Sequence, residues 1–96
     1  MSDATYVGRV WDFLEVGRQD LETLARVIES GDTVAIRSCS QELRLRADTL
    51  GLDDVAKCAG NLETGASNCC LAYTVVSYNC LRGKLNGLKE ELARVP

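Results

Sequence analysis

The sequence contains no histidine, one proline and few aromatic residues, which make up 5% of the chain. Without an imidazole there is no side chain whose ordinary pKa suits a general base near neutral pH. A glycine-rich loop of the kind that cradles phosphate groups is also missing. These absences predict that the protein is not an enzyme.

Basic charge is scarce as well, with 11 Lys and Arg against 14 Asp and Glu and a net charge of −3 at pH 7. Nucleic acids are bound by clustered basic side chains, so we expect no nucleic-acid partner.

No apolar run approaches the roughly 20 residues that a membrane span needs. The opening residues MSDATYVGRV lack the basic-then-apolar order of a secretory signal. We therefore expect a cytoplasmic protein with no membrane segment.

The cysteines are odd in number and irregular in spacing: Cys39, Cys58, Cys69, Cys70 and Cys80. A disulfide framework favours an even number, and a zinc site favours CxxC pairs or histidines. We expect mostly small, buried free thiols, no bound metal or cofactor, and no effect of a reductant on thermal stability. Oxidation chemistry is conceivable only at Cys69-Cys70, although adjacent helical residues point about 100° apart.

Apolar residues recur at spacings of three and four through most of the chain, which is typical of amphipathic helices. The only β-branched cluster, residues 74–76, falls inside such a pattern. A chain of 96 residues can bury one core with little to spare, so residues 1–96 are interpreted as a single domain. The sequence predicts an all-α protein.

Five helical segments can be delimited. A short opening helix over residues 6–14 is separated from residues 21–28 by a bend or break at Gly17. Asp32 is expected to cap the next helix, which ends at Gly51, and Asp53 to cap a third that ends at Gly65. Short connections between helices favour antiparallel neighbours. The expected architecture is an up-and-down antiparallel four-helix bundle with a short extra N-terminal helix.

We expect the last helix to be the longest and its buried face to follow one apolar stripe. The stripe consists of Leu71, Val75, Tyr78, Leu81, Leu85, Leu88, Leu92 and Val95. Gly83 and Gly87 also lie on this helix, and we interpret them as sites of tight packing inside the monomer. Close helix association through such glycines is a strong signal only in membranes.

Gln41 lies about 200° around its helix from the expected core residue Leu43, so it should face away from the core. Its exposed neighbours on the same helix are expected to be Arg37, Leu45 and Asp48. The sequence thus predicts an amide presented to solvent near the middle of a helix.

This helix resembles the second bundle helix of histidine-phosphotransfer (HPt) domains, which reads His-x-Leu-Lys-Gly-Ser-x-x-x-Leu-Gly. The matching positions are Gln41, Leu43, Arg44, Leu45, Arg46, Leu50 and Gly51. Three further segments, in the same order, are similar to the family's flanking helices: LETLARVIESGDTVAIRSCSQ, VAKCAGNLETGA and SYNCLRGKLNGL. The resemblance therefore covers most of the chain.

Two departures from the family bear on function. The resemblance puts Gln41 at the position of the phospho-accepting histidine, and a glutamine amide cannot act as that nucleophile because its lone pair is delocalised. Leu45 stands where the family has a glycine that gives a receiver domain room to approach. The resemblance therefore implies a protein that binds phosphorelay partners without accepting phosphate.

Two hypotheses follow. The first is a non-catalytic HPt-like signalling adaptor or inhibitor that binds a response-regulator receiver domain or a sensor kinase. Its binding residues would be Arg37, Gln41, Arg44, Leu45 and Asp48, with Arg44 matching the family's lysine and attracting an acidic pocket. Arg44 is equally consistent with a solvated helix charge. The alternative is a structural bundle that self-associates through its last helix. We expect a monomer or a weak homodimer.

Overall fold

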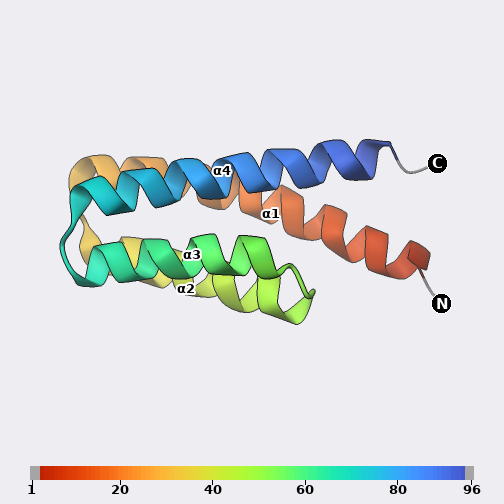
Figure 1. Ribbon diagram of the computed structural model, residues 1–96, viewed down its shortest axis with the longest axis horizontal. Coiled ribbons are helices and arrows are strands. Elements are labelled where there is room, and N and C mark those ends of the chain that lie inside the picture. Colours follow the sequence, from red (N-terminus) through yellow and green to blue (C-terminus); the bar gives the residue numbers. More distant parts are fainter. Residues whose placement is uncertain (1–2, 95–96) are drawn as a thin grey trace.

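The computed structural model describes residues 3–94, and the side chains of residues 5–94. Within this range the chain forms four helices and no strand: α1 (Asp3–Ser30), α2 (Thr33–Thr49), α3 (Asp53–Ser67) and α4 (Leu71–Ala93). The chain reverses direction at each connection (Figure 1). Each helix packs against the next, and α4 returns to pack against α1. The all-α expectation is confirmed.

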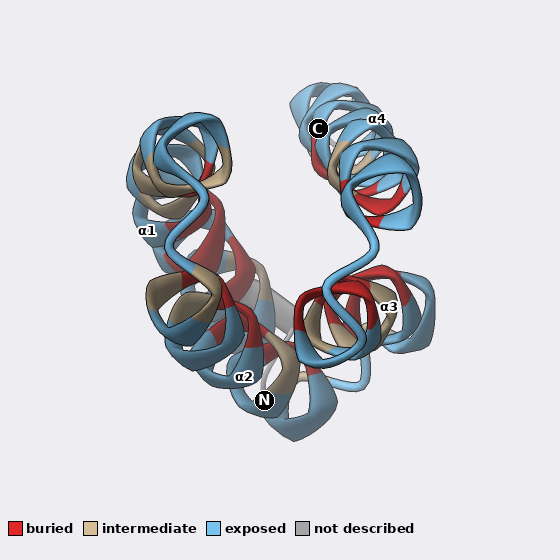
Figure 2. Ribbon diagram, turned by 90° about the vertical axis from the view of Figure 1, so that its left-hand side faces the viewer, coloured by how far each residue is buried: buried red, intermediate tan, exposed pale blue. Residues whose placement is uncertain are grey.

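The core lies along the middle of the four helices, where the buried residues face one another (Figure 2). Each helix contributes a fully buried leucine to it: Leu24, Leu43, Leu62 and Leu81. Most of the other side chains expected in the core are buried or partly buried too, namely Ile36, Leu50, Val55, Tyr78, Leu85, Leu88 and Leu92. The molecule is elongated, with extents of 43 × 20 × 18 Å.

Residues 3–30 form one continuous helix, so the expected break at Gly17 and the separate short N-terminal helix are wrong. With 28 residues this helix is longer than α4, which has 23, so the expectation that the last helix is the longest is wrong as well. Gly17 is buried inside α1 and faces α4. A Cβ atom at this position would lie 3.4 Å from Cδ1 of Leu85. The glycine therefore lies in the contact between α1 and α4 and does not interrupt the helix.

The ends of α2 lie where the sequence predicts them. The Asp32 carboxylate accepts a hydrogen bond from the Ala35 backbone N–H at 3.1 Å, which caps the helix as expected. Gly51 has a φ of +74°, a left-handed conformation that glycine adopts without strain, and it stops the helix where expected.

The ends of α3 differ from the sequence-based expectation. The N-cap is Leu52 and not Asp53, which lies in the first turn of the helix. At the other end Gly65 lies inside the helix, which continues to Ser67. Asp53 still interacts favourably with the helix dipole because it is an acidic residue at the N-terminal end.

The buried stripe expected on α4 is wrong over the first half of the helix. Leu71 is 65% exposed and Val75 is 39% exposed, whereas the polar residues Thr74 and Ser77 are buried. From Tyr78 onward the expected stripe does face the core. Val95, its last member, lies outside the described residues.

The reason is a close approach of α3 and α4. A Cβ atom at Gly65 would lie 2.6 Å from Oγ1 of Thr74 and 3.2 Å from its Cα atom. Only a small residue of α4 fits against this glycine, so the larger Leu71 and Val75 point outward. Burial of Thr74 is tolerated because its hydroxyl donates to the Cys70 carbonyl oxygen at 2.8 Å.

The expectation of mostly buried cysteines is also wrong. Cys58 is buried and Cys39 is partly buried, but Cys69, Cys70 and Cys80 are exposed. Cys69 and Cys70 lie in the connection between α3 and α4, where Cys69 has a φ of +53°, and not on a helix as assumed. Three thiols are therefore accessible to solvent.

The contact between Gly65 and Thr74 makes a testable prediction. Gly65→Ala should lower the free energy of unfolding by about 1–2 kcal/mol, because overpacking outweighs the gain in helix propensity. Urea denaturation measures the change. Gly8→Ala is the matched control, since nothing lies within 4 Å of a Cβ atom at Gly8. It should raise the stability by about 0.5–1 kcal/mol. Equal effects of the two substitutions would contradict the close approach.

Candidate functional site

Gln41 is exposed in the middle of α2, as expected. The buried residues of this helix, Ile36, Ser40, Leu43 and Ala47, lie on its opposite side. Arg37, Leu45 and Asp48 are exposed with Gln41, and Leu45 is 52% exposed. The helix thus brings four of the five expected site residues to one outward surface.

A further residue of this surface was missed from the sequence. Val34 is 68% exposed and precedes Gln41 by seven residues, which places it two turns away on the same side of the helix. The spacing of seven residues between Val34 and Gln41 could have shown from the sequence that both lie on one side of the helix. We call the exposed surface formed by Val34, Arg37, Gln41, Leu45 and Asp48 the Gln41 face.

Arg44, the fifth expected residue, does not belong to this face. Its side chain is only 32% exposed, so the expectation that it is largely exposed is wrong. The guanidinium Nε donates to Oε1 of Glu63 on α3 at 3.0 Å, and Nη1 lies 4.0 Å from Oδ2 of Asp48. The charge of Arg44 is therefore neutralised locally and joins α2 to α3.

Gly60 on α3 lies next to the aliphatic part of the Arg44 side chain. A Cβ atom at Gly60 would lie 3.4 Å from Cδ of Arg44, so the bare helix surface is in contact with the arginine stem. Arginine side chains commonly bury their aliphatic part in this way while the guanidinium reaches a partner. The interaction that holds Arg44 against α3 is its ion pair with Glu63.

A second arginine joins the other side of α2 to α1. Arg46 lies 3.2 Å from the carboxylate of Asp20 and 3.6 Å from that of Glu42. Burial raises the pKa of the Asp20 carboxyl, and the neighbouring Arg46 opposes this shift. Arg37 is then the remaining cation of the Gln41 face, and it makes no ion pair with any residue in the described range.

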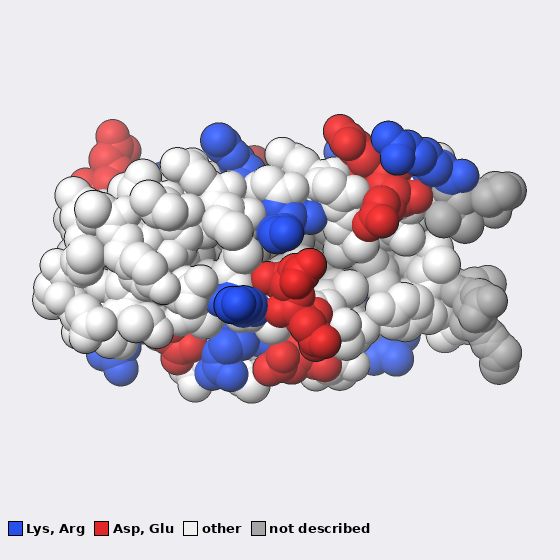
Figure 3. Space-filling model, viewed as in Figure 1, with Lys and Arg blue, Asp and Glu red and all other residues white. Residues whose placement is uncertain are grey.

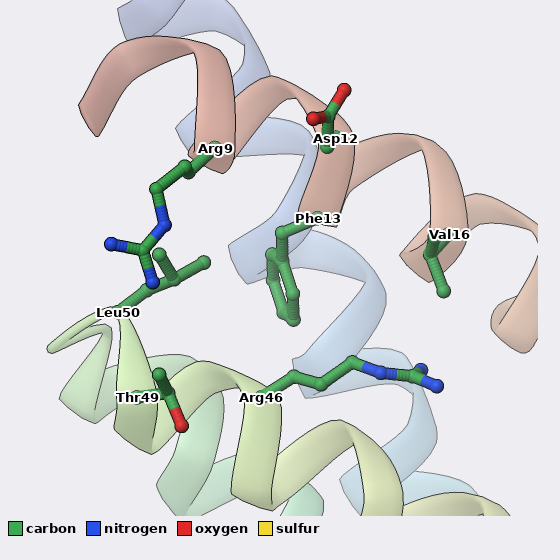
Figure 4. Close-up of a pocket in the computed structure, with 7 residues that line it drawn as sticks. All are labelled: Arg9, Asp12, Phe13, Val16, Arg46, Thr49 and Leu50. Carbon is green, nitrogen blue, oxygen red and sulfur yellow. The ribbon is translucent and has the colours of Figure 1, made fainter. Parts of the chain in front are cut away.

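A pocket of about 370 Å³ lies beside this helix, between α1 and α2. Phe13 points into it, with Arg9 and Arg46 on either side (Figure 4). The lining residues are Arg9, Asp12, Phe13, Val16, Arg46, Thr49 and Leu50. The pocket thus has an aromatic side chain at its floor and charged side chains at its rim.

The described residues contain no group of three or more Cys, Asp or Glu side chains placed to hold a metal ion. In the same part of the chain, no helix is both long and apolar enough to cross a membrane. What the Gln41 face offers chemically is an amide that can donate and accept hydrogen bonds, flanked by two apolar side chains. The residue at the centre of this face is therefore not a nucleophile.

Comparison of the chain with protein-family models, curated protein sequences and solved structures gives no match.

The ion pair between Arg44 and Glu63 can be measured by a double-mutant cycle. Arg44→Ala and Glu63→Ala, singly and together, should reveal a coupling of about 0.5–1 kcal/mol in urea denaturation, because both side chains are partly shielded from water. The exposed pair Arg18 and Glu22 is the control and should couple more weakly. Additive effects of the two substitutions at Arg44 and Glu63 would show that Arg44 is not held by α3.

Proposed function

We propose that the protein is a non-catalytic, HPt-like binding module built on an up-and-down four-helix bundle. Its partner would be the receiver domain of a response regulator or the matching domain of a sensor kinase. One observation carries the proposal. Gln41 occupies the position that the resemblance gives to the phospho-accepting histidine, it is exposed in the middle of α2, and the chain contains no histidine.

The chemistry of the site separates binding from phosphotransfer. A phospho-accepting histidine attacks phosphorus with a ring nitrogen and later leaves from it. The amide nitrogen of Gln41 cannot do either because its lone pair is delocalised into the carbonyl group. The protein would occupy a partner's docking surface and leave the partner's phosphate where it is. It would act as an adaptor or an inhibitor, according to what else the partner binds.

Most of the binding free energy would come from burial of the apolar side chains of the Gln41 face. Val34 and Leu45 both expose most of their side chains, and burial of either against a partner removes apolar surface from water. Arg37 would supply the positive charge toward an acidic receiver pocket, in place of the Arg44 role expected from the sequence. Its contribution would fade with added salt.

A phosphotransfer assay tests the proposal. The natural protein should bind a receiver domain but take no phosphate from its phosphorylated form. Gln41→His, combined with Leu45→Gly, should gain acid-labile phosphate, because the pair of substitutions restores the nucleophile and the space around it. Gln41→His alone should gain less if Leu45 obstructs the approach. Phosphate is counted by radiolabel transfer and its stability in acid and base.

Binding is measured separately by calorimetry with the same receiver. Leu45→Ala should weaken it by about 1–2 kcal/mol if Leu45 is an adhesive contact. Val76→Ala is the control, because Val76 is also exposed but lies on α4. If no receiver binds any form and neither histidine variant is phosphorylated, the resemblance to HPt domains is one of fold alone.

A second candidate function, self-association through α4, has its own supporting observation. Residues 64–81 contain no charged side chain, and the surface over the end of α3 and the start of α4 is correspondingly uncharged (Figure 3). Leu71, Tyr73 and Val76 are exposed on it. Gly83 and Gly87 have nothing within 4 Å of an added Cβ atom, so the expectation that they pack inside the monomer is wrong.

A second copy of the chain is the partner that fits this surface. An uncharged surface is matched by another uncharged surface, and two copies related by a two-fold axis present the same surface to each other. Sedimentation velocity should then detect a concentration-dependent dimer. Val76→Lys should shift it to monomer, whereas Leu45→Lys on α2 should not. A sharp monomer at high concentration would exclude this candidate.

A further inference from the structure

Two cysteine side chains meet across the interface between α3 and α4. The Sγ atoms of Cys58 on α3 and Cys80 on α4 lie 2.9 Å apart. A disulfide bond is about 2.0 Å long, so the two sulfur atoms need to approach by less than about 1 Å. Cys58 is buried, whereas Cys80 is exposed to solvent.

The contact belongs to the regular packing of α3 against α4. About two turns from this contact, toward the connection between α3 and α4, Gly65 closely approaches Thr74. One turn in the other direction, Lys84 lies 3.9 Å from the carboxylate of Asp54. The two thiols therefore lie within the continuous packing of α3 against α4, which the close approach at Gly65 fixes on one side.

We propose that Cys58 and Cys80 form a reversible disulfide that joins α3 to α4 when the protein meets hydrogen peroxide. The pair is thus a modification site, and it is independent of the Gln41 face and of the function proposed for it. The same bond can form by exchange with a small disulfide such as oxidised glutathione, which would be reduced to two thiols.

The reaction begins at Cys80 because its thiol is accessible. The Cys80 sulfur, as thiolate, attacks one oxygen of hydrogen peroxide, the O–O bond breaks, and the departing hydroxide takes up a proton to become water. The product is a sulfenic acid on Cys80. The Cys58 sulfur then loses its proton and attacks the Cys80 sulfur, the S–S bond forms, and the S–O bond breaks to release a second water. Two thiols and one peroxide give one disulfide and two waters.

The surroundings of Cys58 suit it to this second role. Burial raises the pKa of the Cys58 thiol to about 11, and the hydrogen bond with Cys80 and the charge of Cys80 act in the same direction. Cys58 therefore stays protonated and out of reach of the oxidant. Lys84 opposes the shift and brings positive charge close to the pair.

The other thiols are less suited to an intramolecular disulfide. Cys69 and Cys70 are adjacent in the chain, and a bond between neighbours closes only with strain. Cys39 lies between α1 and α2, where its Sγ atom is 3.8 Å from the Asp20 carbonyl oxygen. Burial, with the charges of Asp20 and Glu42, raises its pKa to about 11. Of the five thiols, Cys58 and Cys80 are the two that the structure brings into contact.

Oxidation should change the stability of the protein. The new bond would connect residues 22 positions apart and would restrict the unfolded chain. The two sulfur atoms need to approach by less than about 1 Å, so we expect most of this stabilisation to be retained. The expectation that a reductant has no effect then holds only for protein that has met no oxidant.

The test uses the full chain with Cys69→Ser and Cys70→Ser, which removes the competing exposed thiols. Hydrogen peroxide should lower the mass by two hydrogen atoms. Cleavage after glutamate, at Glu42 and Glu63, separates the three remaining cysteines, so a disulfide-linked peptide pair identifies Cys58 and Cys80. The thermal midpoint should rise by about 10 °C and return after treatment with a reductant.

Two single substitutions in the same background serve as controls. Cys58→Ala keeps a small apolar side chain in the core, and Cys80→Ser changes an exposed position, so both variants should fold. Neither should show the linked peptides or the rise in thermal midpoint. Oxidation of Cys80 to a sulfinic acid without linked peptides, or an equal rise in the Cys80→Ser variant, would overturn the proposal.

Discussion

The close approach of α3 to α4 at Gly65 and Thr74 is the constraint on which much of the structure depends. It sets how the first half of α4 is turned, because only a small side chain fits against the glycine. The bulky Leu71 and Val75 are left outside as a result. The same packing of α3 against α4 includes the contact of Cys80 with Cys58. It also leaves apolar side chains exposed on the first half of α4, where the sequence has no charged residue. The absence of a side chain at Gly65 thus decides which residues of the first half of α4 are buried.

The second organising feature is the use of two arginines to fix α2 between its neighbours. Arg44 pairs with Glu63 on α3, and Arg46 pairs with Asp20 on α1. Because both arginines are engaged in ion pairs with neighbouring helices, the Gln41 face consists of an amide, two apolar side chains, the Asp48 carboxylate and, within the described residues, one arginine without an ion pair, Arg37. Binding of a small anion would need several convergent donors, and the described residues of this face do not supply them.

The proposed site and the proposed disulfide lie on different helices, and different measurements address them. The Gln41 face belongs to α2, where binding and phosphate transfer can be followed, whereas Cys58 and Cys80 join α3 to α4 and are followed by mass and thermal stability. Failure of either proposal leaves the other intact. The uncharged surface of α4 provides a third, separate possibility, in which the bundle binds a second copy of itself.

The sequence by itself determined the all-α class, the cap at Asp32, the stop at Gly51 and the exposure of Gln41, since these follow from local chemistry and from the helical repeat. Composition alone also excludes phosphotransfer by imidazole, because the chain has no histidine. Only the tertiary structure decided which face of α4 is buried, that Gly17 lies within one long helix, and that Arg44 turns to Glu63. These depend on how closely two helices approach, and residues far apart in the chain, such as Gly65 and Thr74, set that distance through their size.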